Sequence, residues 1–128
     1  NEDWLEKVKK DCYKEIVQGR LDIRLRKSEL DHLEVFETID SNSIDVCLID
    51  SYHRDLCAIN IVDKMKSGGI LIIDNINYNI PTENSHSPNT RRLGYANSKW
   101  EKFAQLTKNW RYIWTTNGVT DTGIWICN

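Results

Sequence analysis

The chain has no long apolar segment and no strong excess of charge of either sign. Its most apolar run, residues 70–73, falls far short of the about 20 residues that a membrane-spanning helix needs. Seventeen basic and nineteen acidic residues give a formal net charge of −2 over 128 residues. Such a balance argues against a basic nucleic-acid-binding arm and against an acidic tail. We therefore expect neither a membrane nor a nucleic acid as a partner.

Cysteine is sparse, and its spacing excludes the commonest metal and redox motifs. The four cysteines form no C-x-x-C pair; they are Cys12, Cys47, Cys57 and Cys127. An even number leaves two disulfides open, but Cys47 and Cys127 lie in apolar runs where buried free thiols are common. Secreted disulfide scaffolds carry cysteine more densely. We therefore expect a reducing, cytoplasmic environment.

The only methionine is Met65, so the first residue of the chain is not an initiator. The N-terminal residues also lack the basic and then apolar pattern of a signal peptide. We therefore expect a processed product or a fragment of a longer polypeptide. With 40% hydrophobic and 28% charged residues, the chain is suited to bury the core of one soluble domain, which we place over residues 1–128.

The first forty residues predict two helices with a strand between them. Apolar residues recur at spacings of three and four over residues 3–18, and Gly19 ends that pattern. Residues 21–25 alternate apolar and charged side chains, as in a half-buried strand. Ser28, followed three residues later by an aspartate, predicts the cap of a short helix that ends near residue 39.

The centre of the chain predicts a strand, a helix and a second strand. Residues 44–50 and 70–73 are almost continuously apolar, which is typical of parallel strands buried on both faces. Between them, apolar residues at helical spacing predict a helix over residues 53–66, followed by a turn at Gly68 and Gly69. Such a crossover is right-handed and joins parallel strands of one sheet.

The last part of the chain predicts a long connection, a helix and a hairpin. Residues 76–97 show no periodicity and are rich in Asn, Ser, Thr and Pro, as in a lid or binding loop. Ser98 and Glu101 form an S-x-x-E capping box for the next helix. Strands over residues 110–116 and 123–127 flank an Asn-Gly turn signal, which favours a hairpin.

Three stretches of sequence carry a family resemblance. Residues 43–53, SIDVCLIDSYH, are similar to the S-x-D-x-x-x-I-D-G-x-H pattern on strand four of class I S-adenosylmethionine-dependent methyltransferases. Residues 66–75, KSGGILIIDN, are similar to the K-P-G-G-x-L-x-x-D-N pattern on strand five of that family. Residues 116–125 resemble its closing hairpin. The resemblance implies an α/β, three-layer, mostly parallel Rossmann-like sheet with a C-terminal antiparallel hairpin.

The chain departs from this family in its N-terminal part. It lacks the glycine-rich loop after strand one and the acidic residue after strand two, which hold the cofactor's methionine part and ribose. The resemblance thus covers the C-terminal two thirds of the domain, with strands one and two missing. The strands at residues 21–25 and 44–50 would then lack neighbours, and such open edges favour self-association. Ser51 also stands where the family usually has glycine.

Polar residues follow both central strands, at the edge where open parallel sheets bind ligands. Asp50 ends the first strand, and Asp74 and Asn75 end the second. Three oxygen-bearing side chains suit a hard cation such as Mg²⁺, and metal-dependent O-methyltransferases resemble this pattern. A metal there would orient the acceptor hydroxyl and lower its pKa. The alternative is that these residues cap helices and turns.

Several residues near these strand ends are candidates for catalysis or binding. His53, together with Asp50, is the candidate catalytic base, because the pKa of a histidine lies near neutrality. Arginine clamps anionic groups, so Arg54 and Arg91, with Tyr78, are candidates for binding the acceptor. The candidates for cofactor contacts are Ser28, Glu29, Asp50 and Ser51. The first two of these are equally suited to cap a helix.

The expected function is methyl transfer from S-adenosylmethionine to a small-molecule acceptor, in a protein that is inactive as this isolated chain. The runner-up is a receiver-like or other non-catalytic α/β binding module, since residues 45–50 also resemble a phosphoacceptor strand. A receiver needs an acidic pair after a first strand, and the pair at residues 2–3 has no strand before it. A nicotinamide-dependent oxidoreductase needs a G-x-G-x-x-G loop, which the sequence does not contain.

Overall fold

The computed structural model describes residues 2–128, which fall into two compact units that meet in the sequence between His32 and Leu33. No helix within these residues is both long and apolar enough to cross a bilayer. The first unit is helical, and the second contains a sheet, two covering helices and the candidate functional site. All residues that line the candidate site therefore belong to the second unit.

The first unit contains two short helices and the start of a third. Helix α1 spans Glu2–Asp11 and α2 spans Tyr13–Val17, so the predicted single helix is interrupted at Cys12. Gly19 follows in the left-handed conformation (φ 68°), and its amide donates to the Ile16 carbonyl at 3.0 Å. A left-handed glycine with such a bond ends a helix, as the sequence predicted.

The strand predicted over residues 21–25 is wrong, because residues 21–27 form neither helix nor strand. An alternating pattern gives a strand only where a second strand completes the backbone ladder, and residues 2–32 contain none. Helix α3 (Glu29–Glu37) begins at the predicted capping pair. The Asp31 amide donates to Ser28 Oγ, and the Ser28 amide donates to Asp31 Oδ2, each at 3.2 Å.

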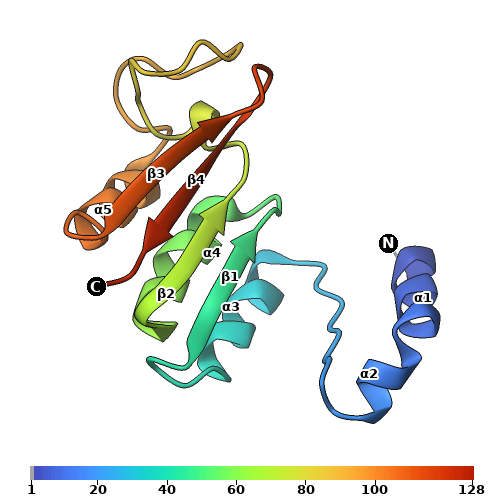
Figure 1. Ribbon diagram of the computed structural model, residues 1–128. Coiled ribbons are helices and arrows are strands. Elements are labelled where there is room, and N and C mark those ends of the chain that lie inside the picture. The colour runs from blue at the N-terminus through green and yellow to red at the C-terminus, as the bar shows by residue number, and fades with distance from the viewer. Residues whose placement is uncertain (1) are drawn as a thin grey trace. The chain divides into compact units, whose positions relative to one another are not determined.

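Four strands form one mixed sheet in the second unit, in the order β1-β2-β4-β3 (Figure 1). They span Ile44–Ile49 (β1), Met65–Ile73 (β2), Arg111–Thr116 (β3) and Asp121–Ile126 (β4). β1 and β2 are parallel, whereas β4 is antiparallel to both β2 and β3. The predicted α/β fold and C-terminal hairpin are confirmed. The sheet is mostly antiparallel rather than mostly parallel, because only the β1–β2 pairing comes from a strand–helix–strand crossover.

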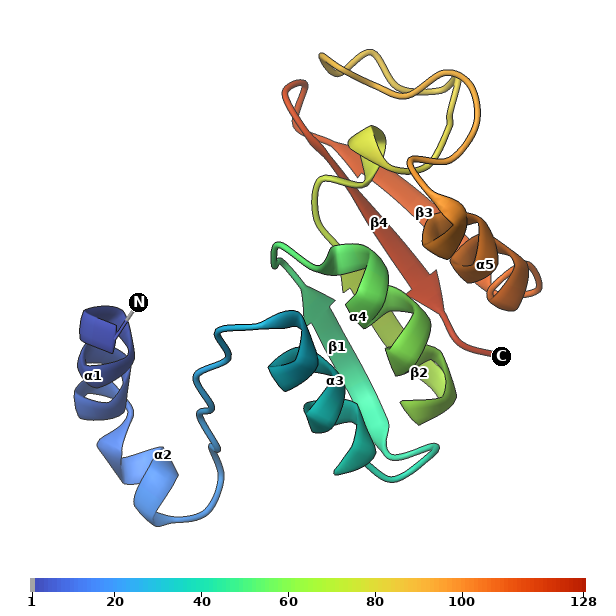
Figure 2. The same cartoon turned by 180° about the vertical axis from the view of Figure 1, so that it is seen from behind.

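The helices of the second unit cover a single face of the sheet. Helix α4 (Arg54–Ile61), which continues as a 3-10 turn over Val62–Lys64, and helix α5 (Ser98–Leu106) lie on the same side in both views (Figures 1 and 2). Val46 and Leu48, on the other face of β1, are 60% and 66% exposed. The predictions of three layers and of a first strand buried on both faces are therefore not met within residues 33–128.

The turn predicted at Gly68 and Gly69 is instead part of strand β2. The helix ends before Met65, and β2 carries extra residues at an irregularity opposite the start of β1. Gly68 has a φ of 79°, and a Cβ at Gly69 would lie 2.8 Å from the Lys66 carbonyl oxygen. Both positions therefore require glycine, for the bend of the strand and for close backbone approach.

Aromatic rings pack α5 onto the hairpin. The Phe103 ring meets the Trp100 and Trp125 rings edge to face, with centroids 5.8 and 5.0 Å away. The Trp125 ring also stacks on Tyr112 at 4.6 Å. A Cβ at Gly123 would lie 2.5 Å from the Trp125 ring. The absent side chain at Gly123 therefore makes room for the largest ring of this cluster.

Gly123→Ala should lower the free energy of unfolding by about 1–3 kcal/mol, because the new methyl group overlaps the Trp125 ring in a filled core. Chemical denaturation followed by tryptophan fluorescence measures the loss. The control is Gln105→Ala at an exposed position of α5, which should stay within about 0.5 kcal/mol of the parent. An alanine variant as stable as the parent would show that the ring moves aside at no cost.

Candidate functional site

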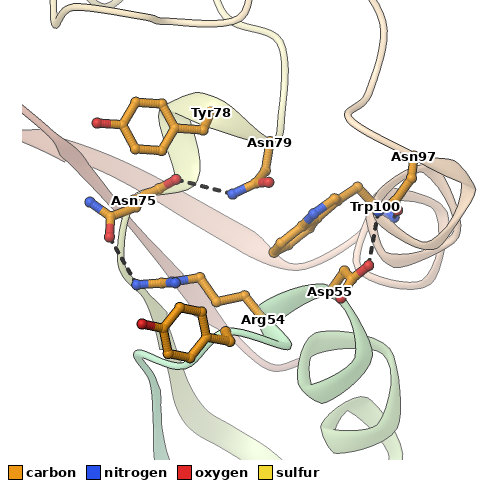
Figure 3. Close-up of a pocket in the computed structure, with 8 residues that line it drawn as sticks. Arg54, Asp55, Asn75, Tyr78, Asn79, Asn97 and Trp100 are labelled. Carbon is orange, nitrogen blue, oxygen red and sulfur yellow. Dashed lines mark hydrogen bonds between the residues drawn. The ribbon is translucent and has the colours of Figure 1, made fainter. Parts of the chain in front are cut away.

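A cavity of about 360 Å³ opens beside the carboxyl ends of β1 and β2 (Figure 3). Its wall comes from the start of α4, from the 3-10 turn η2 (Ile76–Tyr78) that follows β2, and from the start of α5. The lining residues are Tyr52, Arg54, Asp55, Asn75, Tyr78, Asn79, Asn97 and Trp100. The cavity thus lies where open α/β sheets bind ligands.

The Arg54 side chain joins the two strand ends beside this cavity. Its Nη2 donates to Asp50 Oδ1 at 2.5 Å and to Asn75 Oδ1 at 2.9 Å, and its Nη1 donates to the Ser51 carbonyl at 2.5 Å. Only 22% of the Arg54 side chain is exposed. Its Nε is buried and has no hydrogen-bond partner within residues 2–128. Arg54 is therefore a positive charge held in place by three hydrogen bonds.

Asn75 directs the chain from β2 into the cavity wall. It has a φ of 56°, in the left-handed region that asparagine adopts more readily than most residues. Its carbonyl accepts the Asn79 Nδ2 at 3.1 Å and the Tyr78 amide at 3.4 Å. The turn at Asn75 therefore positions both Tyr78 and Asn79 on the wall.

Asp55 joins the start of α4 to the start of α5. Its Oδ2 accepts from Asn97 Nδ2 at 2.8 Å and from Lys99 Nζ at 3.5 Å, while its Oδ1 accepts from the Leu56 amide. Partial burial opposes ionisation, but the hydrogen bonds from Asn97 and Leu56 and the charge of Lys99 outweigh it and lower the pKa of Asp55. The carboxylate therefore holds the two helix starts together in its charged form.

Asn97, rather than Ser98, is the N-cap of α5. Asn97 Oδ1 accepts from the Lys99 amide at 3.0 Å and from the Trp100 amide at 3.2 Å. The predicted helix is confirmed, but its cap lies one residue earlier than the S-x-x-E pattern suggested. Because the same side chain also donates to Asp55, one asparagine ends the long connection and closes the cavity wall.

The long connection between η2 and α5 is tied down at several points. The Arg91 amide donates to the Asn77 carbonyl at 2.7 Å, and Arg91 Nε donates to the Tyr78 carbonyl at 2.9 Å. Arg92 donates to the carbonyls of Thr82 and Ser85 at 2.9 and 2.8 Å. Both arginine side chains therefore donate to backbone carbonyl groups. Arg91, which the sequence predicted to bind the acceptor molecule, does not line the cavity. It instead supports the turn that carries Tyr78.

A buried carboxylate anchors this connection to the hairpin. Asp121 is fully buried, accepts from Ser87 Oγ, and accepts from Trp114 Nε1 at 2.7 Å. The Asp121 amide donates to Asn77 Oδ1 at 3.2 Å. Desolvation alone would raise the pKa of Asp121, but hydrogen bonds from the serines at 85 and 87 and from Trp114 lower it. The connection is therefore an anchored segment and not a structureless one.

The structure brings together some of the predicted metal ligands and separates others. The Asp74 amide donates to the Ile49 carbonyl at 3.1 Å, so the ends of β1 and β2 are adjacent. The Asp74 carboxylate, however, accepts from Thr122 Oγ1 on β4 at 3.0 Å. Asp50 and Asn75 both turn their oxygen atoms to Arg54. The three side chains therefore do not converge on one point.

These residues do not fit a divalent cation. Within residues 2–128, no three His, Cys, Asp or Glu side chains are grouped so that they could hold a metal ion. One carboxylate oxygen of Asp50 and the amide oxygen of Asn75 already accept from a guanidinium, which would repel a second cation at contact distance. We therefore derive no chemical step through Mg²⁺.

The remaining predicted site residues have local roles in the structure. His53 directly precedes α4, makes no capping bond with its side chain and is not part of the cavity wall. Ser51 gives its carbonyl to Arg54, and its Oγ lies 3.8 Å from Cys57 Sγ. Ser28 and Glu29 belong to the first unit, where Ser28 caps α3.

Sequence reasoning missed five residues of the cavity wall, namely Tyr52, Asp55, Asn79, Asn97 and Trp100. Asn97 was detectable, because an asparagine directly before a helical pattern is a favoured cap. Trp100 was assigned to the core, and it is indeed buried, but one part of it also faces the cavity. The other three carried no sequence signal, since Asp55 depends on how α4 and α5 pack and Asn79 depends on the turn at Asn75.

Asp121→Asn should destabilise the second unit by about 1–3 kcal/mol, since the charge-assisted bonds from Ser87 and Trp114 weaken in a buried site. Limited proteolysis should then cut the connection over residues 82–93 faster than in the parent. Asp40→Asn, an exposed aspartate outside this network, is the matched control. Unchanged unfolding and cleavage rates in Asp121→Asn would show that the network does not anchor the connection.

Acid should destabilise the protein partly through Asp55. Its pKa is lowered in the folded state, so its contribution to stability is present above its unfolded pKa of about 3.9 and is lost as the pH falls through the folded value. Between pH 5 and pH 2, the unfolding free energy of Asp55→Asn should therefore decrease less than that of the parent. Denaturant titrations at each pH measure the difference, and parallel curves would contradict it.

No protein-family model and no curated protein matches this chain. Among solved structures, its fold is similar to that of an O-methyltransferase family protein from Burkholderia thailandensis, with a TM-score of 0.54 and 14% sequence identity. The alignment covers 96% of this chain but 40% of that protein, so the chain spans less than half of the matched protein's length. The likeness shows a methyltransferase-like α/β fold.

Proposed function

We propose that this chain forms the acceptor-binding part of an S-adenosylmethionine-dependent methyltransferase that modifies a small molecule. The observation that carries the proposal is the cavity at the joined carboxyl ends of β1 and β2, in a sheet of methyltransferase-like fold. The cavity is of a size that holds a small molecule. Its wall combines aromatic rings with amide, carboxylate and guanidinium groups, which suits a polar acceptor.

The acceptor-binding role falls to the residues that line the cavity. Arg54 offers its positive charge to an oxygen of the acceptor, and Tyr78 offers a ring and a hydroxyl. Asp55 and Asn97 fix the distance between the helices that form the wall. Arg91 contributes indirectly, by holding the Tyr78 carbonyl. Fixing the acceptor in one orientation is itself a large part of the rate increase in such a transfer.

When bound, S-adenosylmethionine would supply the methyl group for transfer to the acceptor oxygen. His53, at the start of α4, is the proposed base that takes the proton of the acceptor hydroxyl. Asp50 is the proposed second catalytic group, next to Arg54 at the end of β1. Asp50 and Ser51 remain the proposed cofactor contacts of the second unit.

The proposed cofactor site also needs strands that pair with β1. Within residues 2–128, β1 has a neighbour on one side only, so its other backbone edge is free to accept a strand. We assign to that edge the two strands that carry the glycine-rich loop and the ribose-binding acid in the family. Alternatively, the same edge could pair with a second copy of the chain, which would give self-association. The proposal also places the protein in the cytoplasm.

The receiver-like alternative is not favoured by the fold. Receiver domains have a doubly wound parallel sheet, whereas β3 and β4 form an antiparallel hairpin next to β2. The carboxylate of Asp50, which would be the phosphoacceptor, is paired with Arg54. A methyltransferase-like sheet accounts for the antiparallel hairpin.

The 128-residue chain alone should bind S-adenosylmethionine weakly, because micromolar affinity needs about 8 kcal/mol from contacts that lie mainly on the proposed additional strands. Isothermal titration calorimetry should show a dissociation constant above about 1 mM. Micromolar binding by this chain would show that residues 2–128 hold the main cofactor contacts and would overturn this division of the site.

The functional test uses a polypeptide that includes the proposed additional strands, and measures transfer of a labelled methyl group to a panel of small hydroxylated acceptors. Asp50→Asn should reduce kcat/KM at least tenfold, because Asp50 lies at the strand end beside the cavity. Asp45→Asn, on the same strand but paired with Lys66 at its other end, is the matched control and should leave kcat/KM within about twofold. Absence of transfer to any acceptor would argue against a methyltransferase.

A further inference from the structure

We propose that Arg54 is the resident cation of the strand-end site, and that it takes the place of a divalent metal between Asp50 and Asn75. A metal at this point would need the oxygen atoms that follow β1 and β2. Arg54 Nη2 contacts one oxygen of each, Asp50 Oδ1 at 2.5 Å and Asn75 Oδ1 at 2.9 Å. The guanidinium thus bridges the two strand ends in the way that a shared ion would.

The carboxylate that follows β1 already has a cationic partner. A guanidinium is a permanent cation in proteins, and that of Arg54 is paired with the carboxylate of Asp50. The carboxylate of Asp74 accepts a hydrogen bond from the Thr122 hydroxyl on β4. A divalent cation between Asp50 and Asn75 would therefore meet a fixed positive charge and would lack the oxygen ligand expected from Asp74, which makes a poor site.

The protein holds the guanidinium in place by more than this ion pair. Arg54 is the first residue of α4, directly after the turn that begins at Asp50. Its Nη1 donates to the Ser51 carbonyl at 2.5 Å, and its side chain is mostly buried. Three acceptors on one guanidinium fix the plane of the group as well as its position.

The inference deepens the proposed function and rests on it for its chemical meaning. In a methyltransferase, Arg54 would hold the acceptor oxygen by charge and hydrogen bond, where a metal would hold it by coordination. The prediction is that the parent site binds no divalent cation, and that removing the guanidinium allows a divalent cation to bind there. Cation binding needs neither a methyl donor nor an acceptor, so it is measured independently of methyl transfer.

The experiment measures Mn²⁺ binding to the 128-residue chain by electron paramagnetic resonance of the free ion, supported by calorimetry. Arg54→Ala should bind Mn²⁺ at least tenfold more tightly than the parent, because Asp50 and Asn75 lose their cation. Adding Asp50→Asn to this variant should remove the gain. Adding Asp45→Asn instead should preserve it, since Asp45 pairs with Lys66 away from the cavity. Circular dichroism and thermal unfolding show whether each variant is folded.

Arg54→Gln is measured in parallel, because it keeps the stem and a hydrogen-bond donor if the alanine variant fails to fold. Two results would overturn the proposal. The first is submillimolar Mn²⁺ binding by the parent that Asp50→Asn abolishes, which would show that the arginine yields to a metal. The second is folded Arg54 variants that bind Mn²⁺ no more tightly than the parent within threefold. If the proposed methyl transfer alone is wrong, the cation results stand while the transfer assay gives no product.

Discussion

The bonds from Arg54 to Asp50 and Asn75 are the interaction on which the geometry of the candidate site depends. The parallel register, which ends at Ile49 opposite Ile73, delivers both oxygen atoms to the same edge of the sheet. The guanidinium then fixes the start of α4 against the end of β2. Because Asn75 also turns the chain into η2, the same contact positions the wall that carries Tyr78. One arginine and one strand pairing therefore determine most of the cavity.

The parts of the fold that sequence predicted well are those determined by local or strongly patterned contacts. The strand–helix–strand unit follows from apolar runs on either side of a helical pattern, and the hairpin follows from its turn. Residues 21–25 do not form the expected strand, because alternating apolar and charged residues give a strand only when a partner strand is present. Continuous apolar character in β1 likewise did not reveal that one of its faces would remain uncovered, as Val46 and Leu48 show. Both errors arise because the pairing and the burial of a strand depend on other segments, which the local sequence does not reveal.

The same distinction separates the predicted and the missed residues of the site. Asp50, Arg54 and Asn75 were predictable because the ends of parallel strands meet at one edge. Asp55 was not, because its bond with Asn97 forms only when α4 and α5 pack side by side. The structure does not support the expected metal site, for a related reason. The sequence displayed the oxygen ligands, but not that the turn after β1 would bring the Arg54 guanidinium between Asp50 and Asn75.

Within residues 2–128, one face of β1 is exposed and one backbone edge of β1 has no partner strand, and both lie next to the candidate site. Val46 and Leu48 expose aliphatic surface, and the edge of β1 exposes backbone groups, next to the strand end that bears Asp50. Both features cost free energy in water unless another segment covers them. A strand that paired with β1 in parallel would bring its own carboxyl end beside Asp50, at the rim of the cavity. The contact that would satisfy the edge would therefore also add residues to the rim of the candidate site.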